Sequence, residues 1–433
     1  MKSKAIEILN NNWRNEFTVP SENLYPFQWK WDSGFTAIGL AHFNMGRAKK
    51  EISTLLDAQW ENGLIPHIIF HTKSDTYFPG ADFHCSNLHP KASKKYKSTG
   101  MSQPPVTGFV LQELYRISKD KTAILQYIES VIDKVYKNHN YLYENRDPKN
   151  EGLVYIYHNW ESGTDNSPVW DTIFERMDSP EFKFNRKDTL HVDASQRPSH
   201  QEYNHYLQII EIAKKYAYDD AKIAKHSPFL VQDPLFNTVL IKSNESLIKL
   251  YKLIPNSEKK IKQLKNWQNK AINRFNEKLY NQELKAYIYY DLRADKAIKE
   301  ITSSSFAPIF AKIPSKKQVE ELTQNLMQNF ASDDYYLCAS YNPKSSKFNP
   351  KKYWRGPVWV NLNWMLYKGL KEYGYQEIAS QIKKDTLEIV QQEGFYEYFD
   401  PRKKEYTKPR SKAYGGENFS WTAALVLDLL NEN

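Results

Sequence analysis

The feature that most limits the possible folds is a long series of segments in which apolar residues recur at spacings of three and four. This period places the apolar side chains on one face of a helix. The segments are residues 35–59, 107–118, 122–143, 203–217, 236–252, 257–280, 316–330, 359–373, 376–392 and 418–431. Strand patterns are sparse, and AYIYYDL (286–292) is the clearest candidate for a small hairpin strand. The chain is therefore predicted to be mostly α-helical.

Aromatic, Gly and Pro residues gather in the connections between these segments. Examples are NLYPFQWKWDSGF, NWESGTDNSPVWD and YWRGPVWVNLNW. No low-complexity linker or shift in composition marks a domain boundary, so residues 1–433 are predicted to form one continuous helical domain. A toroid of helix hairpins would bring alternate loops together at one end, where distant loops could build a single pocket.

The net charge of +9 raises the question of nucleic-acid binding. The lysines, however, alternate with apolar positions in helical stretches such as 256–275, which is typical of a solvated helix face. We therefore expect no nucleic-acid partner. A helical repeat that binds nucleic acid remains a rival class, and its binding would weaken steeply as salt rises.

The cysteine content bears on the cellular compartment. Cys85 and Cys338 are too few for a multi-bridge secreted framework or for a closed four-ligand zinc site. The N-terminal residues show no signal-peptide pattern, and no apolar run approaches the roughly 18 residues of a membrane span. We expect a cytoplasmic protein with no membrane partner. The sequence does not indicate the oligomeric state.

Paired acidic residues in the loops suggest glycoside hydrolysis. Cleavage of a glycosidic bond needs one protonated carboxyl group and one ionised one. Asp165 in ESGTDNS and Glu417 in GGENFSWT are the best pair, because each follows a Gly-containing turn beside Asn and aromatic residues. Either could instead cap a helix. As the acid, Asp165 should have a raised pKa, through desolvation by Trp160 and Trp170 or through a nearby carboxylate.

Motifs along nearly the whole chain resemble, in the same order, those of glycoside hydrolase family 63, particularly its bacterial mannosylglycerate and glucosylglycerate hydrolase branch. They are QWKWDSGF (28–35), GMSQPPV (100–106), NWESGTDNSPVWD (159–171), YWRGPVWVNLNW (353–364) and ENFSWTAAL (417–425). The resemblance implies an all-α (α/α)6 barrel and exo-acting, inverting hydrolysis of a small α-linked glucoside or mannoside, with no metal or cofactor. Asp165 would be the general acid and Glu417 the general base, about 6.5 to 9.5 Å apart.

The resemblance also implies a set of residues that contact the sugar. Asp32 would bind sugar hydroxyls, although it could also be the N-cap of the following helix. Gln103 would contact the sugar while Pro104 and Pro105 hold its backbone still. The remaining positions are Tyr25, Trp29, Trp31, His67, Gly163, Tyr353, Trp354, Trp359 and Trp421. The aromatic rings suit the faces of a hexose, but a core role for them stays open, and a satisfied buried histidine explains His67 nearly as well.

Arg197 and Tyr203 match positions that hold the substrate carboxylate in the glycerate-hydrolysing branch, and an Arg fork suits such a planar anion. The leaving group would then be acidic. Arg355 is expected to form a structural ion pair instead. Glucoside and mannoside cannot be distinguished, and the conformation of the polar loop 71–99, a candidate lid, is not predicted. An α-glucosidase or trehalase acting on neutral sugars, and a catalytically silent sugar-binding protein, remain alternatives.

Overall fold

The structure is a computed structural model that describes residues 1–178, 180–403 and 413–432. Its α-helices are α1 (Lys2–Asn11), α2 (Lys30–Ala41), α3 (Met45–Asp57), α4 (Ala81–His84), α5 (Thr107–Ile117), α6 (Lys121–Asn145), α7 (Asn159–Ser162), α8 (Asp171–Phe174), α9 (His200–Lys215), α10 (Asp220–His226), α11 (Pro234–Tyr251), α12 (Glu258–Lys278), α13 (Lys316–Asn329), α14 (Val360–Tyr373), α15 (Gln376–Glu393) and α16 (Ser420–Asn431). Its 3-10 helices are η1 (Ser86–Leu88), η2 (Pro168–Trp170), η3 (Asp188–Leu190), η4 (Ala194–Gln196), η5 (Ser303–Ser305) and η6 (Ala307–Ala311).

Short strands, which pair antiparallel, lie in the segments between the helices. They are β1 (Gln28–Trp29), β2 (Ile68–Phe70), β3 (Lys97–Ser98), β4 (Val231–Gln232), β5 (Tyr280–Asn281), β6 (Ala286–Tyr287), β7 (Tyr289–Asp291), β8 (Lys296–Ile298), β9 (Tyr396–Phe399) and β10 (Ala413–Glu417). They form sheets of order β1-β2-β3, β4-β7-β8, β5-β6 and β10-β9. The strand signal predicted in 286–292 is thus confirmed as β6 and β7.

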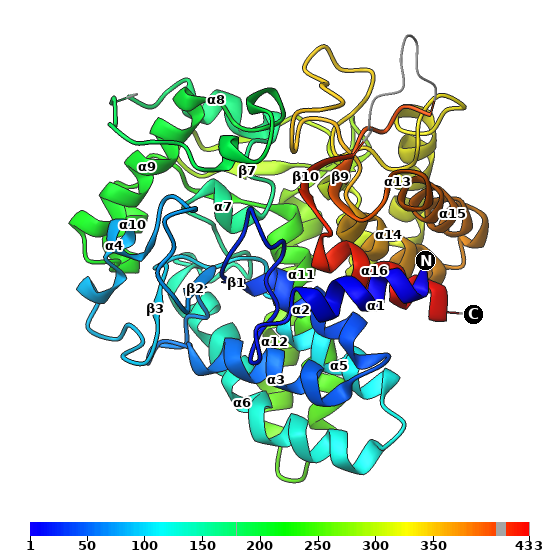
Figure 1. Ribbon diagram of the computed structural model, residues 1–433, viewed down its shortest axis with the longest axis horizontal. Helices are drawn as coiled ribbons and strands as arrows, with labels where there is room; N and C mark the ends of the chain where they lie inside the picture. Colours follow the sequence, from blue (N-terminus) through cyan, green and yellow to red (C-terminus); the bar gives the residue numbers. More distant parts are fainter. Residues whose placement is uncertain (179, 404–412, 433) are drawn as a thin grey trace.

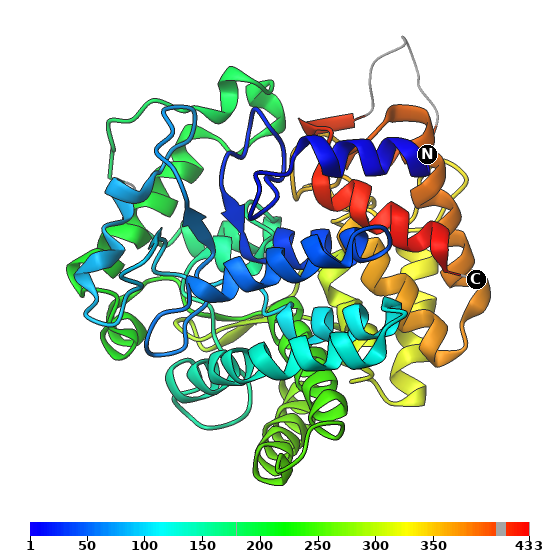
Figure 2. The same cartoon turned by 60° about the horizontal axis from the view of Figure 1, so that its bottom comes forward.

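The main helices form a closed inner ring (Figures 1 and 2). Around this ring α2 packs on α5, α5 on α11, α11 on η6, η6 on α14, α14 on α16, and α16 back on α2. Each inner element alternates along the chain with an outer helix: α1, α3, α6, α12, α13 and α15. Six helix pairs arranged in this way make an (α/α)6 barrel, as predicted, with the 3-10 helix η6 as one inner member.

Burial separates the inner helices from the outer ones. Every residue of α2 is buried, as is nearly every residue of α11 and α16, because these helices are surrounded by neighbours on all sides. The outer helix α12 is the opposite case, since only Leu264, Ala271 and Phe275 are buried along its length. The lysine-rich stretch 256–275 is therefore the solvated helix face that the sequence pattern indicated.

Two glycines let the inner helices approach closely. A Cβ on Gly39 of α2 would lie 2.3 Å from the Ala424 Cα of α16. A Cβ on Gly108 of α5 would lie 2.7 Å from the Ser243 Cβ of α11. Both distances are too short for real atoms, so a side chain at either position would push two ring helices apart.

Several predicted boundaries need correction. The segment 35–59 is two helices, α2 and α3, because the chain turns at residues 42–44 and the Asn44 side chain caps α3 by accepting from the Arg47 N–H at 3.1 Å. The segment 359–373 begins with Trp359 as the N-cap of α14. In the described residues no helix is both long enough and apolar enough to cross a membrane.

Candidate active site

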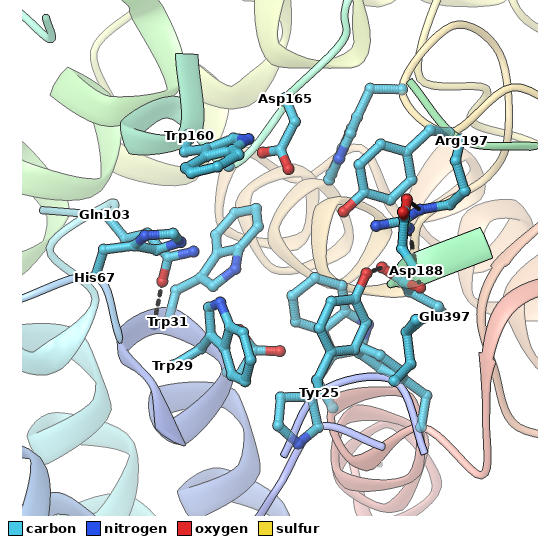
Figure 3. A pocket seen from close by; sticks show the side chains of 18 of the residues that line it. Tyr25, Trp29, Trp31, His67, Gln103, Trp160, Asp165, Asp188, Arg197 and Glu397 are labelled. Atoms are coloured by element: carbon cyan, nitrogen blue, oxygen red, sulfur yellow. Dashed lines mark hydrogen bonds and ion pairs between the residues drawn. The ribbon is translucent and has the colours of Figure 1, made fainter. Parts of the chain in front are cut away.

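A cavity opens where the long loops meet (Figure 3). It is lined by Pro20, Leu24, Tyr25, Trp29, Trp31, Asp32, His67, Tyr77, Phe78, Gln103, Trp160, Gly163, Asp165, Asp188, Arg197, Tyr203, Tyr353, Trp354, Trp359, Glu397, Phe419 and Trp421. These residues come from loops, from the short strands β1 and β9, and from the first turns of helices such as α2, α9 and α16. With the exception of Glu417, every residue that the sequence suggested for the site lies in this wall.

Asp165 reaches the cavity through a tight turn after α7. Gly163 ends that helix with φ of 75°, and a Cβ there would lie 2.3 Å from the Trp31 ring, so only glycine fits. Two side chains then hold the Asp165 carbonyl: the Asn159 amide donates to it at 2.7 Å and the Tyr206 hydroxyl at 3.2 Å. The backbone is fixed, and the carboxyl group is left to face the cavity.

Burial raises the pKa of Asp165 to about 7, opposed by the positive charge of Arg197 and reinforced by the negative charge of Glu397. Trp160 lines the cavity beside it. Trp170 does not line the cavity, and its indole N–H instead donates to the Thr164 carbonyl at 2.8 Å. The predicted direction of the pKa shift and its dependence on a second carboxylate are confirmed, and Trp170 is buried outside the cavity wall.

The carboxylate that accompanies Asp165 is Glu397 on β9. It is buried, and its two oxygens accept from the Tyr25 hydroxyl at 2.8 Å and from the Gly416 N–H at 3.0 Å. Figure 3 shows Asp165 and Glu397 directed into the same space from different parts of the wall. Burial raises the pKa of Glu397, while Arg197 and these hydrogen bonds counteract the rise.

Glu417 does not face Asp165, so that placement is wrong. In the β9–β10 pair Glu417 is the partner of Tyr396, and a register irregularity separates this pair from the Tyr414–Tyr398 pair. Directly opposed residues point to the same face of a sheet, and successive residues to opposite faces. Glu397 therefore points inward, while Glu417 points outward, where it is exposed and lines a separate depression.

The arginine that matched the carboxylate-binding position lies against Glu397 and against a further acid, Asp188. Arg197 is buried, its Nε donates to Asp188 Oδ2 at 3.2 Å, and its Nη1 lies 3.7 Å from Glu397 Oε2. The guanidinium also lies 4.2 Å from the centre of the Tyr353 ring. Among the described residues Nη1 has no hydrogen-bond partner. A buried donor of this kind is costly unless a ligand or water satisfies it.

Aromatic rings form the rest of the wall. Trp354 and Trp359 stack with ring centres 3.8 Å apart, and Trp421 meets Trp31 edge to face at 5.3 Å. The indole nitrogens of Trp354 and Trp421 are buried, and no partner for them lies in the described part of the chain. They supply N–H donors beside flat apolar faces, which suits a hexose.

A buried lysine holds the Gln103 loop beneath the site. Lys30 Nζ donates to Ser102 Oγ at 2.8 Å and to the Gln103 carbonyl at 3.0 Å. Gln103 Oε1 accepts from the Trp31 N–H at 3.1 Å, which leaves the amide nitrogen as its free end. Burial lowers the pKa of Lys30 to about 7, against the attraction of Glu161. The rigidity predicted from Pro104 and Pro105 thus has a second source.

Asp32 and His67 also lie in the wall. Asp32 is in the first turn of α2, whose N-cap is Trp29, so the alternative that Asp32 caps the helix is wrong. Burial raises the pKa of Asp32 well above its usual range, and Glu397 adds to the rise. Burial lowers the pKa of His67, which keeps its imidazole neutral.

Outside the cavity, Arg355 makes the expected ion pair: its Nη1 and Nη2 each lie 2.8 Å from an oxygen of the Asp171 carboxylate.

Sequence reasoning missed Glu397, Asp188 and Tyr77 as wall residues. The signal for Glu397 was present in FYEYFD (395–400), where a single Glu interrupts a run of aromatic residues. A short aromatic run is typical of a buried strand, and an acid among buried rings is unusual enough to mark a site. For Asp188, the first residue of the three-residue 3-10 helix η3, and for Tyr77, which lies in a loop, no comparable pattern exists.

A cavity in which Asp165 and Glu397 face a common space, walled by aromatic rings and hydrogen-bond donors, is typical of a glycoside hydrolase site. The comparisons with known proteins agree. A family model described as the mannosylglycerate hydrolase MGH1-like glycoside hydrolase domain matches residues 25–422. The chain belongs to this glycoside hydrolase family.

Individual relatives span almost the whole chain. It is 35% identical to a mannosylglycerate hydrolase of Rubrobacter radiotolerans over 99% of this chain and 96% of that one. It is 32% identical to a glucosylglycerate hydrolase of Mycolicibacterium hassiacum over 99% and 97%. A solved structure of the family 63 mannosylglycerate hydrolase from Thermus thermophilus, in complex with Tris and D-glycerate, matches with a TM-score of 0.92 at 36% identity, covering both chains fully.

Proposed function

We propose that this enzyme hydrolyses α-linked glycosides of glycerate, with mannosylglycerate as the first candidate substrate and glucosylglycerate as the second, and with inversion at the anomeric carbon. The observation that carries the proposal is the grouping of Asp165, Glu397 and Arg197 around one cavity. The two acids can act as the general acid and the general base of bond cleavage. The buried arginine can pair with a leaving group that carries a carboxylate. The names of the relatives support the choice of glycerate.

Asp165 is the proposed general acid. With a pKa of about 7 it still carries its proton near neutral pH and can donate it to the glycosidic oxygen as the bond to the anomeric carbon breaks. Glu397 is the proposed general base. It accepts a proton from a water molecule, and the water oxygen attacks the anomeric carbon from the face opposite the leaving group. The products are the free hexose and glycerate.

The surrounding groups have separate proposed tasks. Asp32, Gln103 and the indole N–H groups of Trp354 and Trp421 bind hydroxyls of the hexose, supported by their burial in the same wall. Arg197 and Tyr203 bind the glycerate carboxylate, since their donors converge in one part of the cavity. Free thiols at Cys85 and Cys338 support a reducing compartment such as the cytoplasm.

The proposal is tested with a substrate panel of mannosylglycerate, glucosylglycerate, trehalose and short α-glucosides. We expect hydrolysis of the glycerate glycosides, and Arg197→Met should lower kcat/KM on them by about 100-fold or more because a carboxylate loses a buried charged partner. NMR of the first product should show the β-anomer. Preferential cleavage of trehalose would assign the cavity to neutral sugars, and binding without cleavage would indicate a silent sugar-binding protein.

A further prediction concerns Lys30 as a positioning residue. Lys30→Met removes the donor that holds the Gln103 backbone, so we expect kcat/KM on the glycerate glycoside to fall by about tenfold or more as the sugar contact shifts. The exposed Lys262 of α12 provides the control, and Lys262→Met should behave as the unaltered enzyme. A loss of thermal stability in Lys30→Met with unchanged kcat/KM would show that Lys30 serves the fold only.

A further inference from the structure

Asp188 is a carboxylate that lies inside the cavity but has no part in the proposed reaction. Its Oδ2 accepts from Arg197 Nε at 3.2 Å and from the Tyr203 hydroxyl at 3.5 Å. Figure 3 shows it beside Arg197 on the same side of the cavity as Glu397. An internal carboxylate thus already occupies donors of Arg197 and Tyr203, which are the two residues proposed to bind the leaving group.

Binding a second anion beside the Arg197 guanidinium is electrostatically unfavourable. Arg197 is already paired with Asp188 on its Nε edge and lies 3.7 Å from Glu397 on its Nη1 edge. A carboxylate that approached the same guanidinium would meet the negative charges of both side chains, and like charges in a poorly solvated site repel strongly. A carboxylate-bearing leaving group that takes the Arg197 Nε and Tyr203 hydroxyl donors therefore requires Asp188 to give up its contacts with them.

The structure also provides an alternative partner for Asp188. Arg186 Nε donates to Asp188 Oδ1 at 2.9 Å, and a second nitrogen of Arg186 contacts Oδ2. Arg186 is itself held by the Pro198 carbonyl and lies 4.4 Å from the centre of the Tyr203 ring. Asp188 can thus release Arg197 and Tyr203 while keeping its charge paired with Arg186, so a change in partners leaves no buried unpaired carboxylate.

We propose that Asp188 is a built-in competitor for the leaving-group carboxylate. It holds the Arg197 and Tyr203 donors, keeps the guanidinium oriented, and withdraws onto Arg186 when a carboxylate-bearing ligand binds. The same competition favours release of the acidic product after cleavage. The inference rests on the proposed function, because it assumes that the cavity accepts a carboxylate beside Arg197.

The test is calorimetric titration of D-glycerate, and of uncharged glycerol as its counterpart, into the unaltered enzyme and into Asp188→Asn. If the two donors are free in about a tenth of the molecules, removing the competing charge lowers the Kd for D-glycerate about tenfold. The ratio of glycerol to D-glycerate affinity should change by the same factor. Asp193→Asn is the matched control, because Asp193 is an exposed acid of the same segment that does not line the cavity.

An unchanged or higher Kd for D-glycerate in Asp188→Asn would overturn the proposal, the higher value meaning that Asp188 only positions Arg197. Asp188→Ser provides a second variant in case Asp188→Asn does not fold. Binding is measured without catalysis, so the two proposals fail separately. Tighter D-glycerate binding in an enzyme that does not cleave glycerate glycosides would support the competition and refute the substrate. Cleavage without tighter binding would refute the competition alone.

Discussion

Replacement of Glu397 by Gln should lower kcat on the glycerate glycoside by about 1000-fold or more. A general base contributes roughly 100- to 10,000-fold, and an amide cannot accept a proton from the attacking water. The amide keeps the size of the side chain and can still accept from the Tyr25 hydroxyl, so the loss should be in kcat with little change in KM. Steady-state kinetics with purified protein measures both constants.

Glu417→Gln is the matched control for this variant. Both acids belong to the same β9–β10 hairpin, but only Glu397 lines the cavity. We expect Glu417→Gln to retain activity within about twofold, since exposed substitutions away from a site have small effects. The reverse result, with Glu417→Gln inactive and Glu397→Gln active, would restore the role that the sequence motif suggested for Glu417 and remove Glu397 from the mechanism.

The helical content could be predicted because most of the helices carry their own periodic signal, whereas the barrel was predicted from the resemblance of the motifs to family 63. The exceptions show where that signal ends. The inner element η6 has the sequence APIFA (307–311), which is too short for a helical period and contains Pro308 near its start. Its place in the ring is set by contacts with α11 and α14, which only the folded chain supplies. The N-terminal helix α1 packs on α16 from the other end of the sequence, and its pattern alone is weak.

In the candidate site too, some positions follow from local sequence signals and others depend on contacts between distant segments. The position of Asp165 follows from local chemistry, because the Gly163 turn and the hydrogen bond from the Asn159 amide to the Asp165 carbonyl act within a few residues. The choice between Glu397 and Glu417 depends on the register of a hairpin with an irregularity in it. In a strand, a shift of one residue exchanges the buried and exposed faces. A Gly-Gly sequence before Glu417 looked like the mark of a catalytic turn, but Gly416 serves instead as a donor to Glu397.

Arg197 illustrates a limit of another kind. Its presence in the site was predicted from the motif, but its partners were not, because Asp188 reaches it from η3, a 3-10 helix that is too short to show a periodic pattern. These partners affect which anions Arg197 can bind. Arg197 keeps Nη1 without a hydrogen-bond partner among the described residues, but Asp188 holds its Nε edge, so an anion that uses this edge must displace an existing pair.

Asp165→Asn tests the other half of the mechanism through its pH dependence. Catalysis needs protonated Asp165, whose pKa burial raises to about 7, so kcat/KM of the unaltered enzyme should fall as pH rises above about 7. On the acid side kcat/KM should fall as Glu397 gains a proton, giving a bell-shaped profile that belongs to the pair. Asparagine cannot donate a proton, so kcat should drop by about 100- to 10,000-fold and the residual rate should lose its alkaline limb.

The loss should also depend on the leaving group. A glycoside whose leaving group departs as a stable anion, such as a dinitrophenyl α-mannoside, needs little protonation. Asp165→Asn should therefore lose far less activity on this substrate than on mannosylglycerate. Glu397→Gln should be slow on both, because the attacking water needs its base whichever group leaves. An equal loss in Asp165→Asn on both substrates, with the alkaline limb retained, would mean that Asp165 binds the sugar and another group delivers the proton.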